Sequence, residues 1–336
     1  MSVTAAIVRT AAALEALEPA WWELWRRART ATPFQSPAWL VPWWRAFHPG
    51  ELVTAVAWKD RRLVGLAPFY REDGPFGRRL LPVGISLSDY HDVLLDEADA
   101  EEAAAALMAA FDADGSWDAL ECEELPPGAA VLRLPVPPGC AETLSVQSAC
   151  PVLALPGPDL MRFLPGQTRR KLNLARNRAA RRGGFRIARA GGADLPEAFA
   201  ELARLHALRW QARGEGGLLA DERVPAFHAE ALPRLDAAGV LRLYILRLDG
   251  AAAAAFYGFS HRGRGYSYLT GFDPAFAFES PGALLLAHAV EEAIAEGAQE
   301  FHFLRGREAY KYEWGAVDRL NRRRSLRRAV PEQSVA

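Results

Sequence analysis

Cysteine is scarce in this sequence, and the sites that depend on it are disfavoured. The chain of 336 residues has 3 cysteines, Cys122, Cys140 and Cys150, and none of them forms a CxxC pair. Three cysteines cannot all pair within one chain, which argues against a disulfide framework. The 7 histidines also lack the spacing of metal ligands. We therefore expect cysteines that act as small buried apolar residues, and no metal site.

Other catalytic patterns are missing too. The sequence has no GxGxxG, GxxxxGK[ST], GxSxG or HExxH motif, which disfavours a dehydrogenase, a P-loop NTPase, an α/β-hydrolase and a zinc peptidase. No apolar run reaches the roughly 20 residues of a membrane span. The first 17 residues lack the layout of a secretion signal. These absences predict a cytoplasmic protein without a transmembrane segment.

Neither sign of charge dominates. The sequence has 40 Lys and Arg against 41 Asp and Glu, a formal net charge of −1, which argues against nucleic-acid binding over the whole surface. Hydrophobic residues make up 50% of the chain, so a disordered or collagen-like protein is excluded. The length is that of two ordinary domains.

The two halves follow one order of predicted elements: hairpin, strand, helix, strand. In the first half these are Leu52–Trp58, Leu63–Tyr70, Tyr90–Leu95, Ala98–Phe111 and Trp117–Glu121. In the second they are Leu241–Leu248, Ala252–Ser260, Tyr266–Thr270, Pro281–Glu296 and Glu300–Leu304, with Asp249-Gly250 as a hairpin turn. A strand–helix–strand crossover predicts that its two strands are parallel in one sheet. The fold class is therefore α/β with mixed sheets.

Proline marks the expected boundary between the halves. The segment Leu125–Pro158 contains eight prolines, a density typical of extended linkers or edge segments. We predict domains at residues 1–155 and 156–336.

Positive charge is concentrated on one predicted helix, residues 166–182. It carries Arg169, Arg170, Lys171, Arg176, Arg178, Arg181 and Arg182, with no acidic residue between them. Such a run is usually a solvated face, but seven positive charges also fit an anionic partner. A phosphorylated cofactor, a nucleotide-linked substrate, an RNA end and an anionic lipid surface all remain open. A second basic cluster spans residues 319–328.

The helix predicted from Pro281 begins at Ser280-Pro281-Gly282. Serine is a good N-cap, and proline at the first helical position gives up an N–H that has no helical partner. Gly282 allows another group to approach the backbone. The start of this helix can therefore hold a phosphate, or it can be a capped crossover helix that binds nothing.

The segment from Phe301 to Gly315 starts at the end of a predicted buried strand, where α/β sheets usually bind ligands. Between residues 305 and 313 it holds two arginines, two tyrosines, two glutamates and Lys311. Arginine can bind a carboxylate or phosphate, and lysine can stabilise an oxyanion. Internal ion pairs at a solvated helix start are the alternative.

A further helix, around residues 202–214, places His206 and Trp210 on one face. His206 can carry a proton near neutral pH, although a structural histidine beside core leucines is equally consistent. The glycine-rich run 214–217 that follows can be a binding loop or a plain turn.

Several of these segments resemble a known family. Residues 205–210, 280–282 and 303–315 are similar to acyltransferases of the CelD type, which belong to the GNAT superfamily and are associated with cellulose or exopolysaccharide biosynthesis. In the first half, residues 34–39 and 88–92 resemble the same family. The resemblance covers about residues 20–320.

The resemblance implies two tandem GNAT-like domains with mixed central sheets flanked by helices, a layout shared with Fem-type aminoacyltransferases. Acyl-CoA would be a co-substrate, with no tightly bound cofactor. Its pantetheine arm would lie where strands 266–270 and 300–304 splay, and its pyrophosphate at the start of the helix between them. The resemblance, together with the segments described above, gives as cofactor-binding residues Ser280, Gly282, Ala283, Leu284, Arg305 and Gly306.

The resemblance implies a catalytic role for one residue, and we infer the other roles from the proton transfers that amide formation needs. Lys311 is similar to a lysine of Fem-type enzymes that supports the transferred carbonyl. Tyr310 would protonate the leaving thiolate, and His206 or Glu308 would accept the proton of the amine. The residues expected to bind substrate are Trp210, Arg209, Arg170, Asp89 and Tyr90.

We therefore expect an N-acyltransferase that uses acyl-CoA and an amine-bearing small molecule or glycan precursor. Residues 279–283 depart from the usual GNAT phosphate pattern, Gln/Arg-x-x-Gly-x-Gly/Ala, which argues against acetyl-CoA and leaves a longer acyl-CoA and an aminoacyl-tRNA open as donors. Transfer from aminoacyl-tRNA is the second hypothesis, and a non-catalytic scaffold in a polysaccharide-secretion assembly is the third. The first half is expected to bind no cofactor and to shape the acceptor groove.

Overall fold

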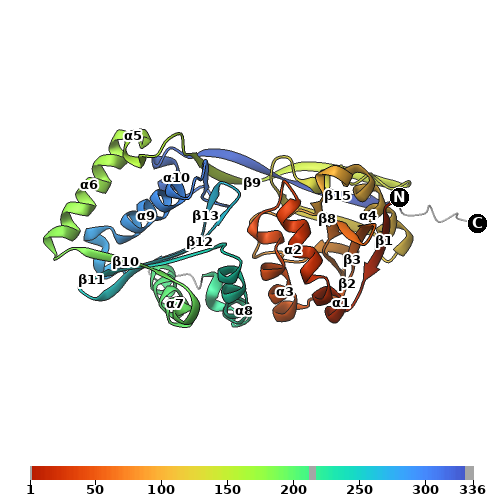
Figure 1. Cartoon of the computed structure of the whole chain (residues 1–336), viewed down its shortest axis with the longest axis horizontal. Helices are drawn as coiled ribbons and strands as arrows, with labels where there is room; N and C mark the ends of the chain where they lie inside the picture. The colour runs from red at the N-terminus through yellow and green to blue at the C-terminus, as the bar shows by residue number, and fades with distance from the viewer. Residues whose placement is uncertain (1, 212–216, 330–336) are drawn as a thin grey trace, which may run out of the picture. The chain divides into compact units, whose positions relative to one another are not determined.

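The computed structural model describes residues 2–211 and 217–329, and the chain divides into two compact units (Figure 1). The first comprises Met1–Ser148 with Leu320–Ala336, and the second Ala149–Arg319. The sequence placed one boundary at residue 155 and assigned everything after it to the second domain. The structure differs because β15 (Val317–Arg328) pairs with β8 (Ala119–Leu125), so the chain returns to the first unit at its end.

In its described residues, the first unit contains two sheets and four helices. The smaller sheet has the order β1-β3-β4-β7, formed by Thr4–Val8, Thr54–Lys59, Arg62–Ala67 and Leu94–Leu95. The other strands run in the order β15-β8-β6-β5-β2, in which β6 is Gly77–Pro82, β5 is Phe69–Gly74 and β2 is Glu51–Leu52. The helices are α1 (Ala11–Ala16), α2 (Glu18–Arg27), α3 (Pro37–Phe47) and α4 (Ala100–Asp114). Short 3-10 turns lie at Pro33–Gln35, Glu97–Asp99 and Ala130–Arg133.

The crossover predicted for the first unit is wrong in its pairing. The expected strand Tyr90–Leu95 is reduced to β7, Leu94–Leu95, because the Asp92 carboxylate accepts the N–H groups of Val93, Ala130 and Val131 and turns the chain. Strand β7 joins the smaller sheet, whereas β8 lies parallel to β6 in the other. The two strands that flank α4 therefore belong to different sheets.

The second unit has one mixed sheet. Its order is β10-β11-β12-β13-β14-β9, formed by Phe185–Ala190, Leu241–Leu248, Ala251–His261, Arg264–Phe272, Glu300–His302 and Cys140–Ala154. Of β9, the residues up to Ser148 belong to the first unit, and this unit contains the rest. Its helices are α5 (Leu160–Phe163), α6 (Gly166–Arg181), α7 (Leu195–Gln211), α8 (Arg223–Ala237), α9 (Pro281–Ala295) and α10 (Ala309–Glu313). Short 3-10 turns lie at Gly192–Asp194, Leu218–Ala220 and Pro274–Glu279.

The layers of the second unit follow from the apolar faces of its elements. Helices α7 and α8 cover one face of the sheet, and α6 and α9 lie on the other (Figure 1). Helix α7 comes very close to β13: a Cβ on Gly271 would lie 2.5 Å from the backbone nitrogen of His206. Such an approach requires glycine, because any side chain there would push the helix away.

The predicted hairpin and crossover of the second unit are confirmed. Asp249 and Gly250 both have positive φ, 50° and 78°, between the antiparallel strands β11 and β12, as a tight hairpin turn requires. Strands β13 and β14 are parallel, but they pair only through Arg264–Tyr266 against Glu300–His302. Strand β13 then continues to Phe272 without β14 beside it, so the two strands separate at this point.

The segment predicted as a linker contains a long strand. Cys140–Ala154 forms β9, and its residues 152–154 pair with β14. Pro151 fits within the strand because its carbonyl accepts the N–H of Phe303, a bond that needs no donor from proline. The high proline content of this segment is therefore compatible with a strand of the sheet as well as with a linker. Across the described residues, every helix is too short or too polar to cross a membrane.

Candidate active site

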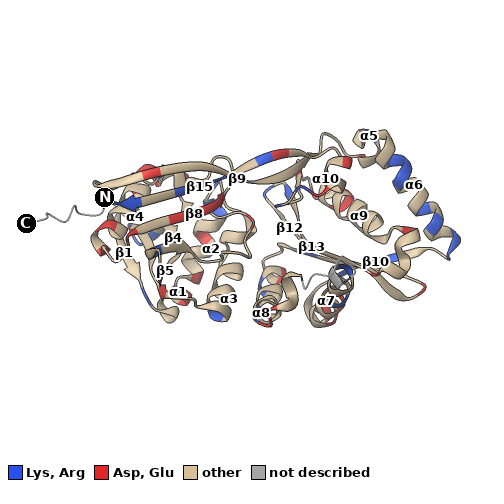
Figure 2. Ribbon diagram, turned by 180° about the vertical axis from the view of Figure 1, so that it is seen from behind, with Lys and Arg blue, Asp and Glu red and all other residues tan. Residues whose placement is uncertain are grey.

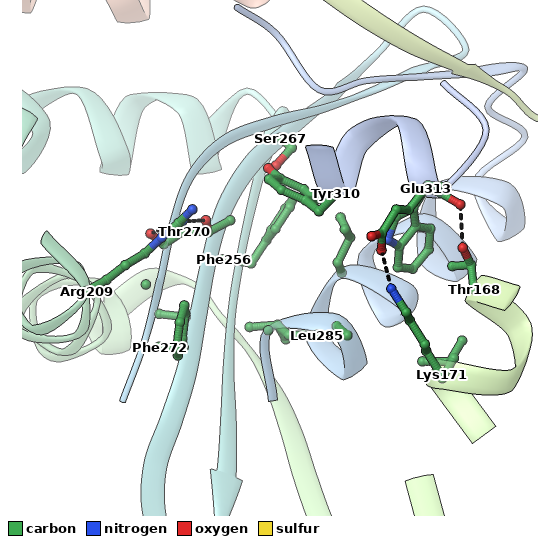
Figure 3. A pocket seen from close by; sticks show the side chains of 17 residues that line it. Thr168, Lys171, Arg209, Phe256, Ser267, Thr270, Phe272, Leu285, Tyr310 and Glu313 are labelled. Carbon is green, nitrogen blue, oxygen red and sulfur yellow. Dashed lines mark hydrogen bonds and ion pairs between the residues drawn. The ribbon is translucent and has the colours of Figure 1, made fainter. Parts of the chain in front are cut away.

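A cavity of about 250 Å³ opens in the second unit where β13 leaves β14 (Figure 3). Five elements supply nearly all of its walls. They are α6 with Thr168, Lys171 and Leu172; β12 with Ala255 and Phe256; β13 with Ser267, Thr270, Gly271 and Phe272; α9 with Gly282, Ala283, Leu285 and Leu286; and α10 with Tyr310, Glu313 and Trp314. Arg209 of α7 completes the lining. The walls are mainly apolar, with a few polar groups, as is usual for small-molecule sites.

Two polar contacts organise the walls (Figure 3). Arg209 Nη1 donates to Thr270 Oγ1 at 2.7 Å, which ties α7 to β13. Lys171 Nζ lies 2.9 Å from Glu313 Oε2, and the Thr168 hydroxyl donates to the Glu313 carbonyl. These bonds fix α6 against α10. The charged groups of the cavity are therefore held in place by neighbouring elements.

The start of α9 forms one edge of the cavity, but Ser280 does not cap it as predicted. Ser280 has φ 54° and ψ 52°, and its side chain makes no capping hydrogen bond. Its carbonyl accepts the N–H groups of Ala283 and Leu284 instead. The left-handed backbone turns the hydroxyl away from the position that a capping side chain takes.

Gly282 is the most open position of this helix start. It is exposed, lines the cavity, and a Cβ there would approach nothing closer than Phe272 at 3.9 Å among the described residues. Of the predicted cofactor-binding residues on α9, Gly282 and Ala283 line the cavity, whereas Leu284 is buried in the core. The structure therefore brings half of this predicted set to the cavity.

Lys311 lies in a buried network behind the cavity. Its side chain is 3% exposed, and its Nζ lies 2.9 Å from Glu308 Oε2. The same nitrogen donates to the carbonyls of Leu304, Arg305 and Gly306 at 3.3, 2.7 and 3.2 Å. These contacts anchor the loop after β14, in which Leu304 and Gly306 have positive φ. The predicted role of Lys311 at the transferred carbonyl stays a prediction, and Lys311, Arg305 and Gly306 are not part of the cavity lining.

Three further predicted residues surround this region. Tyr310 lines the cavity, with its ring 6.1 Å from that of Phe303. Burial acts to raise the pKa of Glu308, but the hydrogen bond and charge of Lys311 and the charge of Arg209 bring that pKa below its ordinary value. Burial, followed by the charge of Arg209, lowers the pKa of His206 to about 4. His206 is therefore neutral at pH 7 and only weakly basic, and it stands behind the cavity wall.

The basic helix α6 is compensated by residues far away in the sequence, although Figure 2 shows positive charge along its length. Arg176 pairs with Glu291, Lys171 with Glu313, and Arg182 with Asp249 and Glu279. Arg178 donates to the Phe278 carbonyl and stacks over its ring. Arg170 and Arg181 are exposed, and in the described part of the chain neither has an ion pair. The anion-binding potential of α6 is therefore smaller than the sequence suggested.

The remaining predicted substrate residues are not brought to the cavity. Asp89 and Tyr90 lie in the first unit, where their carbonyls accept from Asn321 and Gln35. Trp210 belongs to α7, but its side chain, like residues 214–216 of the expected glycine-rich loop, lies outside the described residues.

Several lining residues were missed from the sequence. Thr168, Thr270 and Phe272 carry no motif, although Thr270 and Phe272 alternate on β13 beyond its pairing with β14. That alternation at the end of a splayed strand is the signal that points to them. Within the described residues, no three His, Cys, Asp or Glu side chains are grouped to hold a metal ion.

Comparison with known proteins places this cavity in a recognised class of domain. Residues 166–312 match the model of the acetyltransferase (GNAT) domain. This segment contains the splayed strands, α9 and most of the cavity lining. No curated protein matches the sequence.

Solved structures extend the likeness to the whole chain. FemX is 11% identical, with 96% of this chain and 97% of that chain covered and a TM-score of 0.66. The C-terminal domain (DUF2156) of a putative lysylphosphatidylglycerol synthetase from Agrobacterium fabrum is 12% identical, with 93% and 91% covered and a TM-score of 0.57. A conserved protein of unknown function from Bacteroides thetaiotaomicron is 14% identical, with 96% and 99% covered and a TM-score of 0.60.

These likenesses show the fold: a mixed α/β chain built like FemX, in which residues 166–312 match the GNAT domain. The match of residues 166–312 supports an acyltransferase of GNAT fold. The narrower similarity to CelD-type proteins stays a prediction.

Proposed function

We propose that the second unit transfers an acyl group from acyl-CoA to an amine. The observation that carries this proposal is the apolar cavity at the separated ends of β13 and β14, with the start of α9 at its edge. Acyl-CoA fits this combination, because its pantetheine arm is largely apolar and carries amide groups, whereas its phosphates are anionic. The acceptor is an amine-bearing small molecule or glycan precursor, in a polysaccharide or cell-envelope pathway.

The donor is positioned by backbone groups. Beyond Tyr266, the edge of β13 that faced β14 is open to the amide groups of a pantetheine arm. Gly282 and Ala283 lie at the N-terminus of the 15-residue helix α9, whose dipole favours a pyrophosphate there. The first turn of α9 contains no acidic side chain that would repel it.

The chemistry then needs three events. The amine nitrogen forms a bond to the thioester carbon, the oxyanion is stabilised, and the carbon–sulfur bond breaks. Tyr310 reaches the cavity and gives its proton to the departing thiolate. Glu308, ionised because Lys311 lowers its pKa, takes the amine proton, and His206 is the second candidate for this role.

An irregularity in β13 supports the oxyanion step. The register against β12 shifts between Tyr257 and Gly258, which leaves Tyr268 as the extra residue of a bulge beside Ser267 of the cavity. The extra residue of a bulge is left unpaired in the ladder, and bulges are common next to active sites. Backbone N–H groups here stabilise the oxyanion, together with Lys311 if the loop 304–308 rearranges when the donor binds.

A panel of CoA esters tests the proposal by thermal unfolding. A ligand at 100 times its dissociation constant stabilises a protein by about 2.7 kcal/mol, so a binding ester raises the melting temperature by several degrees. Gly282→Leu extends a side chain into the cavity and removes this shift. Gly157→Leu is the matched control, since Gly157 also has open surroundings and no positive φ, and it keeps the shift. The proposal is wrong if no CoA ester stabilises the protein, or if Gly282→Leu responds like the parent.

Aminoacyl-tRNA is the second candidate donor, favoured by the exposed Arg170 and Arg181 on α6. Phosphate contacts make binding steeply salt-dependent. Tight, salt-sensitive tRNA binding that is lost in the double variant Arg170→Glu/Arg181→Glu would favour this donor over acyl-CoA.

A further inference from the structure

A second cavity, of about 310 Å³, lies in the first unit between β5, β6, β8 and β15. It shares no lining residue with the cavity of the second unit. Five charged side chains line it: Glu72, Arg79, Glu121, Glu123 and Arg323. A polar cavity of this size holds a small, hydrophilic ligand.

Tyr70 is a buried residue that lines this cavity. Its side chain is 2% exposed, packs against the rings of Trp43 and Trp44, and lines the cavity. Within the described residues, its hydroxyl has no hydrogen-bond partner. Burial raises the pKa of Tyr70, and the charges of Glu72 and Glu123 raise it further. The hydroxyl is therefore protonated and close to lining carboxylates, and it can donate to a ligand in the cavity or accept from one.

The two arginines keep donors available. Arg323 gives Nε and Nη2 to Glu121 Oε2, at 3.2 and 3.0 Å. Arg79 gives Nη2 to Glu72 Oε2. In the described part of the chain, Nη1 of Arg323 and both Nε and Nη1 of Arg79 make no further hydrogen bond. These N–H groups are suited to an acceptor that carries negative charge.

Charges of both signs and the Tyr70 hydroxyl thus line one cavity. A purely anionic ligand would be repelled by three carboxylates, and a purely cationic one by two guanidinium groups. An apolar ligand would leave the Tyr70 hydroxyl without a partner. A zwitterion satisfies all of these groups, because its carboxylate accepts from the arginines and its ammonium group donates to the glutamates.

We propose that this cavity binds a free α-amino acid, with its ammonium group at Glu72 and Glu123 and its carboxylate at Arg79, Arg323 and the Tyr70 hydroxyl. The proposal is independent of the acyltransferase function, since it concerns another unit and another set of residues. It assigns to the first unit a ligand site of its own.

Calorimetric titration of the full chain with the twenty α-amino acids tests the proposal. We expect at least one of them to bind. Its N-acetyl derivative lacks the ammonium group and its methyl ester lacks the carboxylate, and both bind at least tenfold more weakly. Glu123→Gln and Tyr70→Phe each weaken binding about tenfold. Asp60→Asn, an isosteric change in the exposed turn after β3, leaves it unchanged, and so does Gly282→Leu in the second unit.

Three results would overturn the proposal: no amino acid binds, the blocked derivatives bind as well as the parent compound, or neither variant changes the affinity. Tyr70→Phe retains the ring and is checked by its melting temperature. Glu123→Gln alters a partly exposed residue, so it carries the test alone if Tyr70→Phe does not fold. Binding of a diamine or of inorganic phosphate in place of amino acids would also count against the zwitterion.

Discussion

Both units contain a strand, a helix and a strand in succession, but the starts of the two helices differ in charge. In the second unit, α9 follows β13, and its first turn has no acidic side chain. In the first unit, α4 follows β7, begins after Asp99, and carries Glu101 and Glu102 in its first turn. The Asp99 carboxylate accepts from Lys59 at 2.6 Å.

The difference shows what turns a crossover helix into a candidate anion site. Both helices have the positive end of a dipole at their start. In α4 that end is occupied by the protein's own carboxylates, which stabilise the helix and would repel a phosphate. In α9 the same end faces a cavity and stays uncompensated. The first unit instead has its own cavity, lined by charges of both signs.

The largest expected effect is a difference between the two units in how their stability depends on pH. Burial lowers the pKa of His228 and of His261 to about 3, and that of His206 to about 4, and all three lie in the second unit. Below pH 6.5 these histidines are protonated in the unfolded chain but stay neutral in the folded one. The second unit therefore loses stability as the pH falls from 6.5 toward 3. For His228 the loss is worth up to about 4 kcal/mol.

The first unit responds with the opposite sign over part of this range. Burial raises the pKa of Asp92 to about 6, so between pH 6 and about 4 the folded carboxyl is protonated while the unfolded one is ionised. Acidification therefore stabilises the first unit there. Hydrogen-exchange protection at pH 7 and pH 5 measures both units separately. His228→Phe should flatten the loss in the second unit, and equal losses in both units would contradict this prediction.

Lys311→Met is the next largest change. It removes a 3%-exposed ammonium group that holds three carbonyls and Glu308, and breaking such a buried network costs about 3 kcal/mol. Urea unfolding measures the loss. The control is Lys171→Met, whose 53%-exposed side chain pairs with Glu313 at the same 2.9 Å and should cost less than about 1 kcal/mol. Similar losses in the two variants would show that the loop 304–308 does not depend on Lys311.

Ala283→Glu gives α9 the acidic first turn of α4. The helix itself should gain about 0.5 kcal/mol from the carboxylate near its N-terminus. Binding of a CoA ester should weaken about tenfold, or about 1.4 kcal/mol, because the carboxylate repels the pyrophosphate. Thermal unfolding without ligand and calorimetry with ligand measure the two effects. Ala283→Gln has the same shape without the charge, and it should bind within a few-fold of the parent; equal binding by both variants would disprove a phosphate site here.

Thr270→Val is expected to have the smallest effect. It keeps the shape of the side chain but removes the hydroxyl that accepts from Arg209 at 2.7 Å. The loss of stability should be about 1 kcal/mol, the usual value of such a bond. Ser267→Val is a comparison on the same strand, and urea midpoints decide between them. An unchanged midpoint in Thr270→Val would mean that Arg209 finds another partner.

The sequence predicted the elements whose signals are local. The turn Asp249-Gly250 and the apolar strands beside it located β11 and β12, and the helix α9 was placed to within one residue of its end. Strand β15 was missed because eight of its twelve residues are Arg, Asp or Asn. Its Arg323 and Arg327 pair with Glu121 of β8, about 200 residues earlier, and no local pattern shows such a partner.

The candidate site was predicted in part for the same reason. Gly282, Ala283, Tyr310 and Arg209 line the cavity, and three of them lie in segments with a motif. The contacts of Lys311 depend on the path of the loop after β14, where Leu304 has positive φ. Composition gives no indication of that path. The sequence likewise contains no sign that Glu291 and Glu279 pair with the arginines at α6, because only the fold brings these residues together.

The close approach of α7 to β13 at Gly271 has a consequence for variation. Position 271 performs no chemistry, yet a single methyl group there would collide with the backbone of α7 at 2.5 Å. The displaced helix would carry Arg209 away from Thr270 and widen the cavity from behind. A survey of all substitutions should therefore find residue 271 among the least tolerant in the chain. The cause would be the short distance between α7 and β13, and not a chemical role of the residue.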